Sequence, residues 1–219
     1  ALRAAVAAGT RAEQAIGLAA DAARAAVITT SGADSNPPSC TFVSAVVTES
    51  TITVGWIGDS RAYWLPTGGQ PICLTTDDSL AVELIASGMP PAEAHANPQA
   101  GALVRWLGVD ADDGPPKTLT LAPDGSGQLV VCSDGLSRYR SAPADLAGSI
   151  SRDTPMATAQ QLVQLALDEG GVDNITVVLV PFPPAAPEGG TQQSAPQLTH
   201  PPDWRPPTLP DEPRPPEWR

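Results

Sequence analysis

The chain opens with apolar residues arranged as they would be on one face of a helix. From residue 1 to about residue 29, Ala, Val, Ile and Leu recur at spacings of three and four, with charged residues scattered between them. This periodicity predicts one amphipathic helix or two short ones, with Gly9 and Gly17 as candidate breaks. The stretch SGADSNPPS at 31–39 has the composition of a loop.

Five runs of β-branched and other apolar residues predict strands. Residues 41–47 and 51–58 are separated by a short polar turn and predict a hairpin. Residues 117–122 and 128–132 flank the turn sequence PDGSG and predict a second hairpin. Residues 174–182 are dense in β-branched side chains and predict a buried strand.

Two further segments have the start and stop signals of helices. Residues 79–88 follow two candidate N-cap residues, Asp77 and Asp78, and end at a glycine. Residues 155–168 begin with a proline and are followed by two glycines. Strands stand both before and after the helices and are joined by short turns. The pattern therefore predicts an α+β domain built on antiparallel sheet, which ends near residue 182.

Composition narrows the classes of partner. The chain of 219 residues has 12 Lys and Arg against 24 Asp and Glu, a net charge of -12, which argues against nucleic acid or anionic lipid as a partner. No apolar run approaches the roughly 18 residues that cross a bilayer, so we predict a soluble, cytoplasmic domain without membrane contact. An acidic enzyme can still act on phosphate if divalent cations supply the positive charge.

The last segment, 183–219, differs from the rest of the chain. About a third of its residues are proline, interleaved with Ser, Gln, Glu and Arg, so it has too little apolar surface to offset the entropy of ordering. We predict an extended or disordered tail. Its PPDWRPP and RPPEWR sequences fit a plain linker, or a polyproline ligand for a partner with an aromatic-lined groove.

The three cysteines, Cys40, Cys73 and Cys132, are far apart and show no CxxC pairing. Neither a disulfide framework nor a zinc site is indicated, and we predict that all three are small buried residues.

Three aspartates stand beside predicted strand ends or tight turns: Asp59 in WIGDSRAYW, Asp134 in VVCSDGLSR and Asp173 in GGVDNITVV. Strand ends are rigid, and a neighbouring glycine lets backbone or ligand approach closely, so several such ends can bring carboxylates to one point. Mg²⁺ and Mn²⁺ prefer oxygen ligands of this kind. Each aspartate taken alone fits an ordinary turn equally well, because Gly-Asp and Asp-Gly are common turn sequences.

The order of these motifs resembles one protein family. GDSRAYWL at 58–65 is followed by LTTDDSL at 74–80, then by a stretch at 87–108 that ends in RWLG, by LVVCSDGLS at 129–137 and by GGVDNITVVLV at 170–180. Together they resemble the metal-dependent serine/threonine protein phosphatases of the type 2C (PPM) class, over residues 1–182.

The resemblance implies a four-layer αββα sandwich of two antiparallel sheets flanked by helices, with a binuclear Mg²⁺ or Mn²⁺ centre at one end. By match to the family's motifs, Asp134 and Asp173 would be ligands of one core metal, and Asp59 with Asp134 would hold a third, weaker ion. Phosphoserine and phosphothreonine in protein substrates would be hydrolysed by a metal-activated water, and no side chain is assigned as the catalytic residue.

The chain also departs from the family pattern. The family's first strand, with its acidic ligand and phosphate-binding Arg, and its DG-x-GG motif are not found, so we expect an N-terminally truncated domain that lacks its first strands. Asp78 replaces a usual His, which we interpret as a surface-loop change. Arg138 follows SDGLS where an acidic residue is common, and is expected to alter the rim of the site. His95 and His200 are expected to be bystanders.

Three functions follow from these features. The first is the metal-dependent phosphatase. The second is a catalytically inactive pseudo-phosphatase that binds or regulates, because the first metal-ligand motifs are absent. The third is an adaptor that acts through its proline-rich tail.

Overall fold

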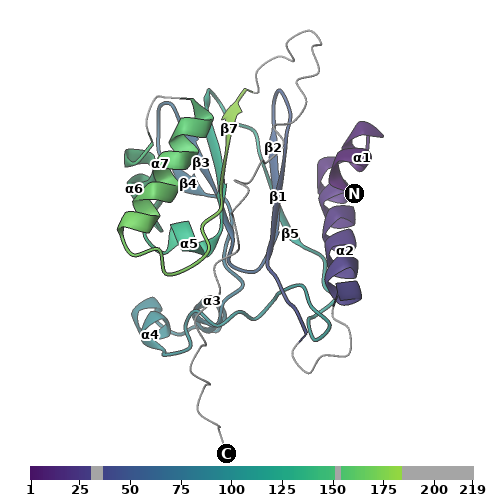
Figure 1. Ribbon diagram of the computed structural model, residues 1–219, viewed down its shortest axis with the longest axis vertical. Coiled ribbons are helices and arrows are strands. Elements are labelled where there is room, and N and C mark those ends of the chain that lie inside the picture. The colour runs from purple at the N-terminus through teal and green to yellow at the C-terminus, as the bar shows by residue number, and fades with distance from the viewer. Residues whose placement is uncertain (31–36, 151–153, 184–219) are drawn as a thin grey trace, which may run out of the picture. The chain divides into compact units, whose positions relative to one another are not determined.

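The computed structural model describes residues 1–30, 37–150 and 154–183. Two antiparallel sheets lie face to face in the centre of this part of the chain (Figure 1). The first sheet has the order β1-β2-β5, with β1 at Phe42–Val47, β2 at Ile52–Ile57 and β5 at Lys117–Leu121. The second has the order β4-β3-β6-β7, with β3 at Arg61–Pro66, β4 at Ile72–Cys73, β6 at Gly127–Cys132 and β7 at Val177–Phe182.

Helices cover the outer face of each sheet (Figure 1). Helices α1 (Leu2–Ala7) and α2 (Ala12–Thr30) lie outside the first sheet, and α5 (Asp134–Ser137), α6 (Pro143–Gly148) and α7 (Pro155–Asp168) lie outside the second. Two short helices, α3 (Leu80–Ala86) and α4 (Pro91–Ala96), lie beyond one end of the sheets. The predicted four-layer αββα sandwich is confirmed.

Alternation along β3 shows how the layers are held together. Ala62 and Trp64 point into the core between the two sheets. Tyr63 and Leu65 point the other way, into the core between the second sheet and its helices. Successive side chains of a strand face opposite sides, so one strand contributes to two cores at once. Both faces of β3 are therefore apolar, and its sequence lacks the polar alternation that marks a half-exposed strand.

The N-terminal segment was predicted to form one helix or two short ones, and it forms a short helix followed by a long one, with one break instead of two. Gly9 has a φ of 77° between α1 and α2, a conformation that glycine adopts without strain. Gly17 lies inside α2 and breaks nothing. Most of the loop predicted at 31–39 lies outside the described residues.

The first predicted hairpin is confirmed, because β1 pairs with β2 from Phe42↔Ile57 to Val47↔Ile52. The second is wrong, because β5 pairs with β2 while β6 pairs with β3 and β7. The turn PDGSG carries the chain from one sheet to the other. A tight turn between two strands has the same local sequence whether the strands pair or change sheets.

The last predicted strand, β7, is an edge strand, not a fully buried one. Its position at the end of the second sheet leaves Val178 49% exposed, while Phe182 is buried against Trp64. Helix α7 matches its prediction at Pro155–Asp168, and the Thr154 hydroxyl accepts a hydrogen bond from the Ala157 amide at its start.

The helix predicted at 79–88 is also present, but its cap differs. Helix α3 begins after Ser79, and neither Asp77 nor Asp78 caps it. Gly88, with a φ of 102°, follows its end as predicted.

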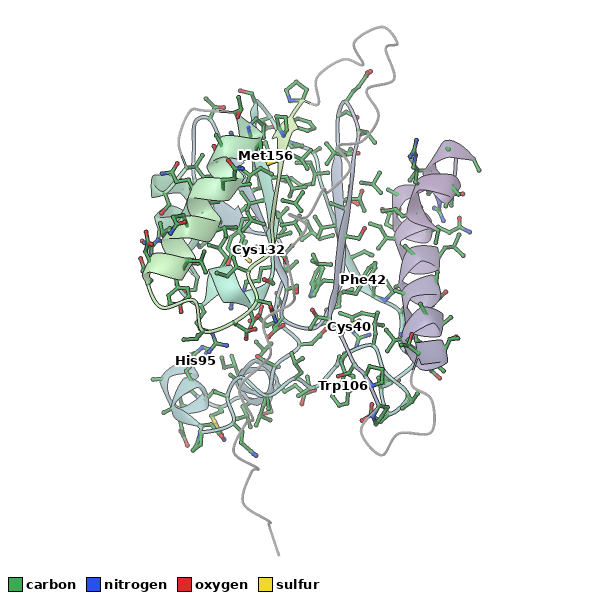
Figure 2. The ribbon with its side chains drawn as sticks, viewed as in Figure 1. Cys40, Phe42, His95, Trp106, Cys132 and Met156 are labelled. Carbon is green, nitrogen blue, oxygen red and sulfur yellow. The ribbon has the colours of Figure 1, made fainter. Side chains whose placement is uncertain are left out.

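The cysteines only partly match their prediction. All three are free, and Cys73 is half-buried. Cys132 is buried beneath the second sheet's helices, and Cys40 is exposed (Figure 2). Burial raises the pKa of the Cys132 thiol to about 12.

None of the helices in the described ranges combines the length and apolar character needed to cross a bilayer. Apart from Pro183, the proline-rich tail lies outside the described residues, as does His200, so the boundary at residue 182 stays a prediction.

Candidate functional site

The second sheet brings the three predicted aspartates to one of its ends. Arg61 at the start of β3 pairs with Cys132 at the end of β6, and Cys132 pairs with Val177 at the start of β7. Asp59 stands just before β3, Asp134 just after β6, and Asp173 in the turn before β7. Antiparallel pairing therefore places all three segments at the same end of the second sheet.

Backbone and hydroxyl groups tie the segment at 133–135 to the segment at 174–176. The Ser133 amide donates to the Thr176 carbonyl at 3.1 Å, and the Thr176 amide donates to the Ser133 hydroxyl at 3.0 Å. That hydroxyl in turn donates to the Asn174 carbonyl at 2.9 Å. We refer to these two segments and their three hydrogen bonds as the clamp.

Gly135 lets the two sides of the clamp approach. A β-carbon at this position would lie 2.4 Å from the carbonyl oxygen of Asn174, closer than any side chain allows. The close approach of the two backbones thus requires the glycine of the SDG motif. Asp134 directly precedes Gly135, and Asp173 directly precedes Asn174, so this contact lies beside both aspartates.

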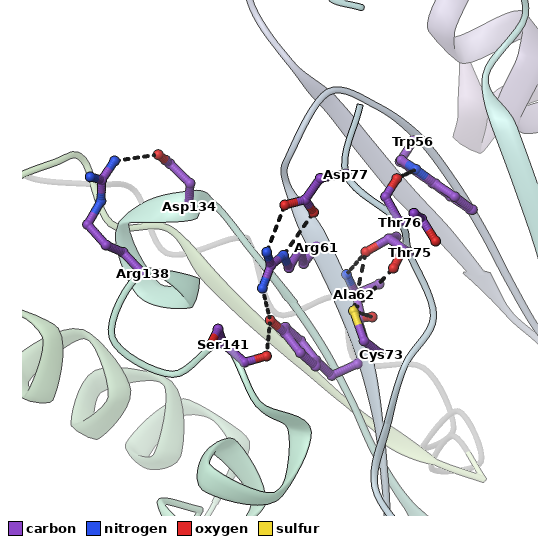
Figure 3. A network of polar contacts seen from close by, with 11 residues as sticks. Trp56, Arg61, Ala62, Cys73, Thr75, Thr76, Asp77, Asp134, Arg138 and Ser141 are labelled. Atoms are coloured by element: carbon purple, nitrogen blue, oxygen red, sulfur yellow. Dashed lines mark hydrogen bonds and ion pairs between the residues drawn. The ribbon is translucent and has the colours of Figure 1, made fainter. Parts of the chain in front are cut away.

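The carboxylates of Asp134 and Asp173 share one cation. The Nη2 atom of Arg138 lies 3.2 Å from Asp134 Oδ2 and 3.8 Å from Asp173 Oδ2, so the two oxygens can be at most 7.0 Å apart, the sum of these distances. The two aspartate side chains are 35% and 41% exposed, and that of Arg138 is 54% exposed. This pair of carboxylates is accessible from solvent. Figure 3 shows the contact between Arg138 and Asp134.

Asp59 lies within electrostatic range of Asp134. Burial raises the pKa of Asp59, and the negative charge of Asp134 raises it further. The negative charge of Asp77 also raises the pKa of Asp59. A backbone hydrogen bond of Asp59 itself and the Arg61 cation lower it, but they do not cancel the rise. Negative charge therefore accumulates at this end of the sheet.

The arginine of the GDSR motif is engaged within the protein. Arg61 donates from Nε and Nη2 to the two carboxylate oxygens of Asp77, at 2.8 and 2.7 Å, and from Nη1 to the Tyr63 hydroxyl at 3.3 Å (Figure 3). Tyr63 in turn donates to the Ser141 carbonyl. Planar two-point pairing of this kind orients the guanidinium strongly. Arg61 therefore fastens the loop after β4 to the second sheet.

Asp78 is not the surface-loop residue that we expected. Its side chain is 2% exposed, accepts the Gly58 amide at 2.9 Å and lies 2.6 Å from Lys117 Nζ and 3.8 Å from a nitrogen of Arg105. The Asp78 amide also donates back to the Gly58 carbonyl. We call this set the Asp78 node. It fixes the turn that carries Asp59 against β5, which a surface loop would not do.

A cavity of about 450 Å³ opens beside Asp59. Arg61, Asp77, Cys73 and His95 also line it. His95, which we expected to be a bystander, lies on α4 and lines the same cavity as Asp59. Asp134 and Asp173 are not part of the lining.

Asp134 and Asp173 offer only oxygen donors, which suits a hard divalent cation that keeps several waters. Two carboxylates at a solvent-accessible edge therefore fit such an ion in chemistry. The described part of the chain contains no group of three or more His, Cys, Asp or Glu that could hold a metal together. Two carboxylates alone would supply only part of the ligands that such an ion needs.

The roles of Arg138 and the Asp78 node were missed in part by sequence reasoning. The four-residue spacing between Asp134 and Arg138 is a signal for a helical ion pair. No comparable signal links Asp78 to Lys117, because their contact depends on how β2 and β5 pair.

No family profile matches the chain. Protein phosphatase PhpP of Streptococcus pneumoniae is 36% identical over 126 residues, which are 57% of this chain and 50% of PhpP. Serine/threonine phosphatase stp of Listeria innocua is 33% identical over 149 residues, 67% of this chain and 58% of the relative. The PPM Ser-Thr phosphatase MsPP from Mycobacterium smegmatis superposes with a TM-score of 0.57 at 31% identity, over 77% of this chain and 69% of MsPP.

The chain belongs to the PPM family of serine/threonine protein phosphatases. The resemblance in its motifs and the four-layer sandwich agree with this assignment. The chain spans about half the length of the curated PPM relatives PhpP and stp that it matches.

Proposed function

We propose that the protein hydrolyses phosphoserine and phosphothreonine in protein substrates, and that Asp134 and Asp173 hold a divalent cation for this reaction. The clamp is the observation that carries the proposal, because it brings two half-exposed carboxylates together at a rigid sheet end. Membership of the PPM family supports the reaction class. MsPP is described in complex with cacodylate, an arsenic oxyanion, which supports a site for phosphate-like groups.

When bound, Mg²⁺ or Mn²⁺ supplies positive charge for phosphate oxygens and acidifies water. The chain's own residues contribute the hard oxygen donors of Asp134 and Asp173 and the clamp that orients them. Asp59 adds negative charge next to Asp134, so a further, weaker cation between these two residues is part of the proposal. The binuclear arrangement also stays a prediction.

The test of function is Mn²⁺-dependent hydrolysis of p-nitrophenyl phosphate and of a phosphothreonine peptide. Asp134→Asn and Asp173→Asn should each reduce the rate by about 100-fold or more, because loss of a group that only orients a metal ligand already costs about 10- to 100-fold. The matched control is Asp113→Asn, which changes an aspartate that is 92% exposed and pairs with Arg24 of α2. Equal activity in all four proteins would exclude a catalytic role for the two carboxylates.

The second candidate is a pseudo-phosphatase that binds or regulates. Two observations favour it: Arg138 lies between the two proposed ligands, and the described residues contain no group of three metal-binding side chains. Absence of both hydrolysis and Mn²⁺ binding in a folded protein would favour this candidate. A groove-binding partner for the proline-rich tail, which lies outside the described residues, also stays a prediction, as does a cytoplasmic location.

A further inference from the structure

Arg138 lies where its positive charge meets both proposed metal ligands. One atom, Nη2, lies within 4 Å of Asp134 Oδ2 and of Asp173 Oδ2, and donates a hydrogen bond to the former. A divalent cation bound by both aspartates would use oxygen lone pairs from the same carboxylates. The guanidinium and the ion therefore compete for the same atoms.

The contact is more than an ordinary pair within one helix. Arg138 follows Asp134 by four residues, and such spacing alone brings the two together on a helical turn. Asp173 comes from a separate segment, and the clamp holds it opposite Asp134. Arg138 thus bridges two parts of the chain that the fold, not the local helix, has placed together.

The neighbouring arginines are committed elsewhere. Arg61 forms its two-point pair with Asp77, and Arg140 donates from Nη1 to Glu169 at 3.0 Å and also pairs through Nη2. Within the described ranges, Arg138 is the one cationic side chain within 4 Å of Asp134 or Asp173. It is the local source of positive charge for this carboxylate pair.

We propose that Arg138 is a built-in counter-ion of the metal-free site, which a divalent cation must displace from Asp134 and Asp173. The inference rests on the proposed function, since it takes these two residues as metal ligands. Arg138 stabilises the two carboxylates in the metal-free protein. Because these ion pairs must break when the cation binds, they lower the apparent affinity for the cation. Its side chain is half-exposed, so it can swing into water when the ion binds.

Calorimetric titration with Mn²⁺, on the protein and three variants, tests this competition. Arg138→Gln removes the cation while keeping a polar side chain, and should bind Mn²⁺ about tenfold more tightly, the scale expected when two half-exposed ion pairs are lost. Arg138→Lys keeps the charge and should stay within about threefold of the unmodified protein. Arg140→Gln removes a positive charge two residues away that pairs with Glu169, and should change the affinity by less than about twofold.

The outcomes separate this inference from the function on which it rests. Equal Mn²⁺ affinity in Arg138→Gln and the unmodified protein overturns the counter-ion role, even if phosphothreonine hydrolysis is present. Equal tightening in Arg138→Gln and Arg140→Gln also overturns it, because general charge would then explain the effect. Tighter binding in Arg138→Gln alone, without hydrolysis in any variant, sustains the inference and overturns the phosphatase proposal. Absence of Mn²⁺ binding in every variant overturns both.

Discussion

Two sets of aspartate–cation contacts at the same end of the sandwich differ in how they are solvated. In the Asp78 node the Asp78 side chain is 2% exposed, and its one carboxylate faces two cations and a backbone amide. The side chains of Asp134 and Asp173 are each more than one-third exposed, and among the described residues one cation serves both carboxylates. A buried carboxylate has lost its hydration and needs cations and hydrogen-bond donors of the protein around it. An accessible carboxylate is solvated by water and can have fewer such partners. At an exposed and rigid position, carboxylate oxygens that are not fully paired with protein cations can bind a cation from solution.

The largest effect on stability is expected at the Asp78 node. Asp78→Ala removes the acceptor of the buried Gly58 amide and the partner of Lys117, and should lower the free energy of unfolding by about 3 kcal/mol. Asp78→Asn keeps an acceptor and should cost less. Urea titration followed by circular dichroism measures both.

The exposed counterpart of this change is Asp113→Ala. Asp113 also pairs with an arginine, Arg24, but its side chain is 92% exposed, so the loss should be under about 1 kcal/mol. Similar losses for Asp78→Ala and Asp113→Ala would contradict the view that burial distinguishes the structural node.

The effect expected at the clamp lies below that of Asp78→Ala and above that of Asp113→Ala. Gly135→Ala places a methyl group against the Asn174 carbonyl, and forces the segments carrying Asp134 and Asp173 apart, at a cost of about 2 kcal/mol. The matched control is Gly148→Ala at the end of α6, where a β-carbon would meet nothing within 4 Å. Urea titration should show a loss in the first variant only. A tolerated Gly135→Ala would mean that the clamp does not depend on this close approach.

The sequence was sufficient to find the three aspartates, because each stands beside a strand end or a tight turn and the motifs occur in a recognisable order. It was also sufficient for α7, whose first-turn proline and following glycines are local signals. The Asp78 node could not be found in this way. Its contacts join a loop to β5, and they exist only because β5 pairs with β2, whereas the sequence around PDGSG predicted a hairpin of β5 with β6.

Similarly, the sequence located Arg138 at the rim of the site but not its contact with Asp173. That contact requires the register Cys132↔Val177 and the hydrogen bonds of the clamp. Exposure was equally hard to predict for Cys40 and Val178, because it depends on which strand lies at an edge and which helix covers it.

The smallest expected effect concerns Asp59, whose side chain is half-buried. Its pKa is raised in the folded protein by burial and by Asp134, so its charged form is less favourable there than in the unfolded chain. The resulting penalty is present at pH 7 and disappears as the pH falls below the ordinary aspartate pKa. With divalent cations removed by a chelator, the melting temperature of Asp59→Asn should therefore be about 2 °C higher than that of the unmodified protein at pH 7. The two proteins should melt at the same temperature below about pH 4. A gain that grows toward low pH would reverse the assigned sign.

The most direct test of the central claim is calorimetric titration of the unmodified protein with Mn²⁺, beside Asp134→Asn, Asp173→Asn and Asp113→Asn. If Asp134 and Asp173 hold an ion together, the unmodified protein and Asp113→Asn will bind Mn²⁺ with the same affinity, and each of the other two variants will lose at least about tenfold. Binding that survives in both Asp134→Asn and Asp173→Asn would contradict the account.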